Sequence, residues 1–287
     1  MQNQSNFLGV SDSAIHHCVR AKFYIGADGM PVLAQIQKFN QPRFRESGWE
    51  SRESESESFA FDVVGNSFDV VGNSEEEEDG GSYANIERAS RRAKISAFDA
   101  IMCNQDLNCF VTFTYSPDNV EDKANYEECY QALKIWLSNR VQRRGLKYVL
   151  VPERTKKGDI HFHAIMNADA LKLVRAYSAK SGRPLTHNGK PLYNVEDWKH
   201  GFTSAELIPD ADGDRRAVAK YIFKYMGKQM GQKIGGRYVL HGGDLKHPLY
   251  VYGEDENEFL EENTESIYLR AVAIDGGSLT YTEWGFI

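Results

Sequence analysis

The chain has 287 residues, of which 41% are hydrophobic and 26% charged, with 15 Phe, 15 Tyr and 4 Trp. This apolar and aromatic content excludes a wholly disordered protein and leaves room for one large domain or two small ones. The net charge of -7 is unevenly distributed: residues 84–250 hold 27 Lys and Arg against 18 Asp and Glu, whereas residues 46–81 hold twelve acids and one arginine. The acidic average therefore does not exclude a partner that carries phosphates.

Hydropathy and cysteine spacing indicate the compartment. No run of 18 or more apolar residues occurs, so no membrane span is expected. The N-terminus does not resemble a signal peptide. The four cysteines show neither C-x-x-C nor zinc-finger spacing, and we expect reduced, mostly buried thiols at Cys18, Cys103, Cys109 and Cys129. These features predict a cytoplasmic protein.

The flanking segments differ in character from the middle of the chain. Within an N-terminal segment of residues 1–45, two β-like runs around Gly26–Gly29 predict a hairpin. Residues 46–82 combine Ser/Glu alternation, the tandem repeat FDVVGNSFDVVGNS and an acidic run, which predicts a disordered linker. The repeat is either a partner-binding motif or the trace of a replication slip. Residues 253–287 form an acidic C-terminal tail.

The main domain, residues 83–252, begins with a predicted helix that ends near Asn104. This helix holds Arg88, Arg91 and Arg92 within two turns, as a phosphate-binding face or a merely solvated one. Alternating β-branched and aromatic residues then predict a strand over 109–115.

Helices and strands alternate in the rest of this domain. We predict helices over about 120–144, 168–181 and 214–231, the first of them stopped by Gly145. Strands are predicted over 146–153, 159–167 and 203–208, the first two as a hairpin. This order favours an α+β fold in which helices pack on an antiparallel sheet.

Two histidines share one face of a predicted strand. His161 and His163 are separated by one residue, so both imidazoles leave the same side, while Phe162 faces the core. Two such imidazoles and one carboxylate are a ligand set for a divalent ion. Glu153, at the end of the preceding strand, is the candidate third ligand, and Asp159 is the alternative.

Two tyrosines share one face of the last predicted helix. Tyr221 and Tyr225 lie four residues apart, and Lys224 and Lys228 repeat that spacing beside them. The pattern is either an amphipathic stripe or a nucleophilic pair for a phosphodiester. In the second interpretation a phenolate attacks phosphorus, a metal polarises the phosphoryl oxygen and a lysine stabilises the anionic transition state.

Three motifs occur in a fixed order, namely FVTFTY at 110–115, HFHAIMN at 161–167 and YIFKYMGK at 221–228. In this order they resemble the motifs of the HUH endonuclease superfamily. Placement of the tyrosines after the histidines resembles its replication-initiator branch. The tyrosine pair is similar to that of microvirus and filamentous-phage initiators, whereas single-tyrosine plasmid initiators retain only the first. The resemblance covers about 84–250.

This resemblance implies a five-stranded antiparallel sheet flanked by helices, with an RRM or ferredoxin-like core and the histidines on a central strand. It implies Mg²⁺ or Mn²⁺ bound by His161, His163 and Glu153. It also implies rolling-circle replication initiation through a 5′-phosphotyrosine, in which Tyr221 makes the first cut and Tyr225 serves the second transfer. Lys224 is then the lysine near the scissile phosphate.

The implied partners follow from this role. Single-stranded or extruded origin DNA would contact Arg88, Arg91, Arg92 and Lys228. A host polymerase would extend the released 3′ hydroxyl. Because the chain lacks G-x-x-x-x-G-K-[ST], we expect a host helicase to unwind the duplex. A phage-encoded chain would act in the bacterial cytoplasm. A single-tyrosine HUH transposase and a non-catalytic origin-binding protein are the alternatives.

Overall fold

The computed structural model describes residues 16–26, 28–44, 80–208, 215–227, 233–253, 256–260, 264–274 and 277–286. The chain divides into two compact units, one of residues 1–63 and 248–287 and the other of residues 64–247. Of the predicted acidic linker, only residues 80–82 lie within the described ranges, so its repeat lies outside them.

The smaller unit is a five-stranded antiparallel sheet with the order β12-β1-β2-β14-β13. The predicted N-terminal hairpin is confirmed, because β1 (His16–Ile25) pairs with β2 (Pro31–Phe44) around a turn closed by a 2.7 Å bond from Gly26 N to Met30 O. One face of the sheet is apolar and packs against the short 3₁₀ helix η4 (Glu256–Phe259) through Val19, Ala21, Phe23, Ala34 and Ile36.

The predicted acidic tail holds two strands of this sheet. Strand β13 (Thr264–Ile274) pairs with β14 (Gly277–Phe286), and β14 pairs with β2. The third C-terminal strand, β12 (Leu249–Gly253), pairs with β1. The acids are concentrated in residues 254–265, before an alternating β-rich sequence, so net charge concealed the strand pattern.

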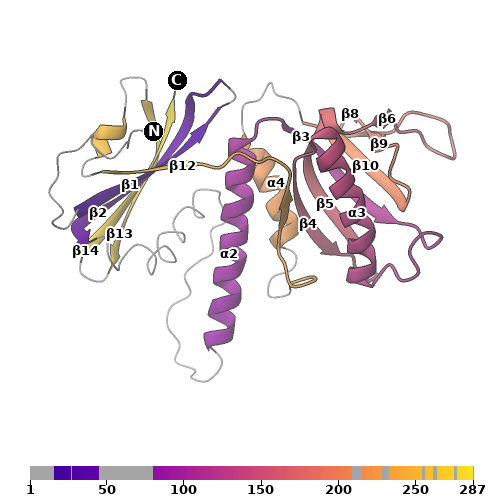
Figure 1. Ribbon diagram of the computed structural model, residues 1–287, viewed down its shortest axis with the longest axis horizontal. Helices are drawn as coiled ribbons and strands as arrows, with labels where there is room; N and C mark the ends of the chain where they lie inside the picture. Colours follow the sequence, from indigo (N-terminus) through magenta and orange to yellow (C-terminus); the bar gives the residue numbers. More distant parts are fainter. Residues whose placement is uncertain are drawn as a thin grey trace, which may run out of the picture. The chain divides into compact units, whose positions relative to one another are not determined.

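The larger unit is built on a seven-stranded sheet with the order β11-β4-β5-β3-β10-β9-β6, in which every neighbouring pair is antiparallel (Figure 1). Its strands are β3 (Leu107–Tyr115), β4 (Tyr148–Arg154), β5 (Ile160–Asn167), β6 (Leu173–Arg175), β9 (Tyr193–Val195), β10 (Gly201–Leu207) and β11 (Leu240–Gly242). Its helices are α2 (Gly80–Cys103), α3 (Tyr126–Arg144) and α4 (Arg215–Gly227), and β7 (Thr186–His187) and β8 (Lys190–Pro191) form a small hairpin.

The predicted α+β class with antiparallel sheets is confirmed. The five-stranded sheet is present in the smaller unit, whereas His161 and His163 lie on β5, an inner strand of the seven-stranded sheet. Among the described residues, no helix is long and apolar enough to cross a membrane.

Helix α3 covers one face of the seven-stranded sheet. Strand β3 alternates strictly between buried and half-buried residues, and its buried side chains join the core beneath α3. Phe113, for example, packs edge-on against Trp136 of α3, with 5.4 Å between ring centroids. Cys129, Leu133 and Leu137 complete the helix's contribution to this core. The other face of the sheet is therefore left for α4.

Helix α3 ends where predicted and begins later than predicted. Gly145 terminates it in the left-handed conformation, at φ 63°. The expected start near Val120 is wrong, because Asn125 caps the helix by accepting the N–H bonds of Glu127 and Glu128. The preceding residues turn instead, with Asp122 accepting from Ala124 N at 2.9 Å.

The predicted helix over 168–181 is also wrong. A single 3₁₀ turn, η2 (Ala168–Ala170), is followed by strand β6, in which Leu173 pairs with Val195 of β9. Ala176 N then donates to Leu192 O at 2.9 Å. Pairing with a partner some twenty residues away overrides local helix propensity here.

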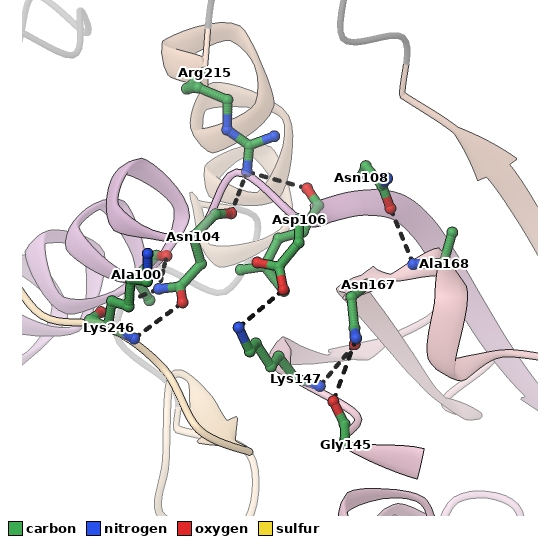
Figure 2. A network of polar contacts seen from close by, with 11 residues as sticks. Ala100, Asn104, Asp106, Asn108, Gly145, Lys147, Asn167, Ala168, Arg215 and Lys246 are labelled. Atoms are coloured by element: carbon green, nitrogen blue, oxygen red, sulfur yellow. Dashed lines mark hydrogen bonds and ion pairs between the residues drawn. The ribbon is translucent and has the colours of Figure 1, made fainter. Parts of the chain in front are cut away.

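Helix α4 is held at its first residue by the turn that ends α2. One guanidinium nitrogen of Arg215, Nη2, donates to three backbone carbonyls of residues 101–107, at 2.8 to 3.1 Å (Figure 2). The side chain of Asn104 in the same turn accepts from Lys246 N at 2.9 Å and donates to Ala100 O at 2.8 Å. This network fixes where α4 starts over the sheet.

We expect Arg215→Ala to lower the free energy of unfolding by about 2 kcal/mol, since charge-assisted hydrogen bonds contribute more than neutral ones and this one is part-buried. Arg215→Lys should recover less than half of the loss, because an ammonium cannot match the planar donor set. Urea unfolding measures both. Lys220→Ala, on an exposed position of α4, is the matched control. Equal stability of Arg215→Ala and the control would contradict the anchoring role.

Candidate active site

The candidate site lies on the face of the seven-stranded sheet opposite α3, here called the site face. Strand registers define it: Thr112 of β3 and Val151 of β4 both lie opposite His163 of β5, and Glu153 lies opposite His161. Paired residues of a sheet point to the same side. The predicted same-face arrangement of the two histidines is therefore observed, and Phe162 between them is fully buried in the core beneath α3.

His163 is held at both ring nitrogens. Its Nδ1 lies 3.1 Å from the Thr112 hydroxyl oxygen, and its Nε2 lies 2.5 Å from Oε2 of Glu153. The imidazole is 5% exposed. A buried imidazole fixed on two sides keeps one orientation, so the carboxylate and the ring are positioned as a unit.

His161 and Asp159 lie beside this pair. Burial lowers the pKa of His161, which outweighs the opposing effects of Glu153 and Asp159. Asp159 forms an ion pair with Lys123, with 3.0 Å between its Oδ2 and Nζ. Of the two carboxylates considered as third ligand, it is Glu153 that contacts a histidine. Within the described ranges, no group of three or more His, Cys, Asp and Glu side chains is arranged to hold a metal ion.

In the metal-free protein, the imidazole of His161 should titrate below its ordinary value of about 6.5. Burial disfavours the charged ring, so His161 stays neutral as the pH falls through 6.5 and becomes protonated only at lower pH. NMR of imidazole signals in chelator-treated protein tests this, with His161→Gln to assign the resonance. A titration midpoint at or above 6.5 would contradict the desolvated environment.

The two tyrosines of α4 lie over His163. The ring of Tyr225 stacks on the imidazole, with 3.7 Å between centroids and 21° between planes. Its hydroxyl donates to the Tyr221 hydroxyl oxygen at 3.4 Å. Phe110 of β3 contacts both phenol rings, with centroid distances of 4.5 Å to Tyr221 and 5.8 Å to Tyr225. Spacing on one helix face thus brings the predicted tyrosine pair to the predicted histidine.

The two phenols differ in environment. Tyr221 exposes 38% of its surface, whereas Tyr225 is half-buried against the sheet. Burial raises the pKa of Tyr225, and the hydrogen bond to Tyr221 and the negative charge of Glu153 raise it further. Tyr225 therefore holds its proton firmly, while Tyr221 is the phenol open to a large substrate.

The predicted basic residues are less closely placed. Lys224 is exposed on α4, between the two tyrosines in sequence, and Lys228 lies outside the described residues. On α2, Arg88 and Arg92 are exposed, and Arg91 forms an ion pair with Glu87 at 3.1 Å. Their assignment to DNA binding stays a prediction.

Sequence reasoning did not single out Phe110 and Thr112, which complete the cluster around His163. Both lie in FVTFTY, a segment that was predicted as a strand without any site residue of its own. Their alternation against Val111 and Phe113, both fully buried, places them on the site face. The signal was therefore present in the strand's own period.

Comparison with known proteins adds the family context. Residues 108–230 match the model of a replication-associated protein family, described as the ORF2 type. This links the site to DNA replication. The matched stretch includes β3, β4, β5 and α4, and hence His163, Glu153 and both tyrosines. No curated protein and no solved structure matches the chain significantly.

Proposed function

We propose that the larger unit is a metal-dependent endonuclease and strand transferase that initiates rolling-circle replication by nicking single-stranded origin DNA through a tyrosine. The observation that carries this proposal is the stacking of Tyr225 on His163, whose Nε2 meets Glu153. This places a tyrosine pair, an imidazole and a carboxylate together within a stretch that matches a replication-associated family. The proposed ligands are DNA at the origin and, through the released 3′ end, a host polymerase.

Donor chemistry supports a divalent ion at this place. Glu153 and His163 already converge, and His161 lies opposite Glu153 on the same face. Imidazole nitrogens and one carboxylate form a facial donor set, which suits Mn²⁺ better than the all-oxygen preference of Mg²⁺. The low pKa of His161 keeps its nitrogen free of a proton near neutral pH. When bound, such an ion polarises the phosphoryl oxygen.

The protein's own groups would carry out the transfer. The Tyr221 oxygen attacks phosphorus while the bond from phosphorus to the 3′ oxygen breaks. The phenol loses its proton and the leaving oxygen gains one, giving a 5′-phosphotyrosine and a free 3′ hydroxyl. Tyr225 donates its hydrogen bond to the Tyr221 oxygen and so orients the nucleophile. Lys224, one residue before Tyr225, stabilises the charge that develops on the phosphoryl group.

In the test, purified full-length protein is incubated with labelled single-stranded DNA of its own replicon and Mn²⁺, with and without a chelator. Denaturing electrophoresis should show a nick that requires the metal and leaves a free 3′ hydroxyl extendable by a polymerase. DNA binding with no cleavage under any divalent metal would replace the nickase by a non-catalytic origin-binding protein.

A further inference from the structure

We propose that Phe202 is a stacking platform for a base of single-stranded DNA, beside the candidate active site on the same sheet face. A strand whose phosphate reaches His163 would then cross β10 with one of its bases on this ring. The choice of DNA as ligand rests on the proposed function, but the platform does not depend on the protein being a nickase.

Strand register places Phe202 on the site face. In the antiparallel pair of β10 and β3, Phe202 lies opposite Thr114 and Ser204 lies opposite Thr112, the residue that bonds His163. Residues of β10 that point to the opposite face enter the core, as Ala205 does at 0% exposure. Strand β10 is two strands from β5, which corresponds to about 10 Å across the sheet.

Phe202 is open to a ligand. It exposes 74% of its surface, more than any other large hydrophobic side chain in the described part of the chain. Tyr221 and Tyr225, by contrast, are both covered in part by Phe110. A single exposed hydrophobic residue is ordinary on a protein surface, so exposure alone carries nothing. Its position in line with the histidine strand distinguishes Phe202 from other exposed residues.

The neighbours of Phe202 suit a nucleic acid. Hydroxyl side chains at Thr112, Thr114 and Ser204 occupy the site face between Phe202 and β5. Such hydroxyls bind phosphate and sugar oxygens. The one acid of this face on β10, Glu206, is bound by His187 at 2.9 Å and lies 3.8 Å from Lys190. Its charge is therefore offset by a cation and a histidine from the β7–β8 hairpin.

A DNA base fits this surface better than a protein does. One aromatic ring among hydroxyl side chains offers a flat stacking area, but no apolar core of the size that a protein interface needs. Aromatic rings on open sheet faces bind single strands by stacking, with little dependence on sequence, because every base has a π-face. Backbone-directed polar groups beside the ring supply the rest of the contact.

The test measures binding without cleavage. Full-length protein is titrated into fluorescein-labelled dT20 in the presence of a chelator, and anisotropy gives the dissociation constant. Phe202→Ala should weaken binding about 5- to 100-fold, the range for loss of one base stack. Phe202→Trp should bind as tightly as wild type or tighter. Phe202→Leu separates stacking from burial of apolar area, and it should weaken binding nearly as much as alanine.

The matched control is Ile135→Ala. Ile135 is 57% exposed on α3, on the other side of the sheet, and its loss should leave binding unchanged. Wild-type affinity in both Phe202→Ala and Phe202→Leu would overturn the platform while leaving the nickase proposal intact. Conversely, weakened binding in these variants of a protein that never cleaves DNA would support the platform and reject the nickase. Failure of wild-type protein to bind dT20 at low salt would overturn the platform as well.

Discussion

Replacing Tyr221 by phenylalanine should reduce the first cleavage of origin DNA by about 10⁴-fold or more, the scale on which loss of a covalent nucleophile acts. Tyr221 is the phenol with 38% of its surface open, whereas Tyr225 is stacked on His163 and its pKa is raised by burial. Tyr225→Phe should therefore retain the first cut and lose the second transfer that closes the displaced circle. Single-turnover cleavage and circle closure are measured separately.

The control for both variants is Tyr177→Phe, which removes a hydroxyl from a tyrosine that is 58% exposed outside the cluster. Melting temperatures of all three proteins establish that the fold is kept. An inactive Tyr225→Phe beside a fully active Tyr221→Phe would reverse the order of the two nucleophiles. Full activity of both single variants in the first cut would show that either phenol serves.

His163→Ala should lower metal-dependent cleavage by more than about 100-fold, since even changes in groups behind a metal ligand cost 10–100-fold. The substitution removes the partner of Glu153 and the ring on which Tyr225 stacks, so it affects both the metal donors and the nucleophile helix. Binding of Mn²⁺, measured by calorimetry on the DNA-free protein, should weaken as well. This second readout is independent of cleavage.

His187→Ala is the matched control, because His187 also bonds a glutamate, Glu206, but on the exposed β7–β8 hairpin. It should keep wild-type Mn²⁺ affinity and wild-type cleavage. Unchanged Mn²⁺ affinity in His163→Ala would remove that residue from the ligand set. Lost cleavage with unchanged metal affinity would instead assign His163 to positioning Tyr225.

The parts of the site that local periodicity encodes could be predicted from the sequence. A period of two put His161 and His163 on one face of β5 with Phe162 in the core, and a period near four brought Tyr221 and Tyr225 together. The contact between Glu153 and His163 was predictable because a short hairpin joins β4 to β5 and so fixes their register.

What depends on distant pairing could not be predicted in this way. Residues 168–181 have helical composition, but β6 forms because Leu173 finds Val195 of β9. The C-terminal strands β13 and β14 are stabilised through pairing with β2, more than 200 residues away in sequence. Arg215 anchors α4 through carbonyls about 110 residues upstream. Phe202 could be assigned to the site face only once the register of β10 on β3 was known.

The most direct test of the tyrosine mechanism is to identify the residue that becomes linked to DNA. Purified protein is incubated with single-stranded DNA of its replicon and Mn²⁺, digested with nuclease and protease, and mapped by mass spectrometry. We expect a nucleotide attached through a 5′ phosphate to Tyr221, with a second population on Tyr225 after strand transfer, and neither when a chelator is present. Cleaved DNA with no covalent adduct on either tyrosine would contradict this mechanism.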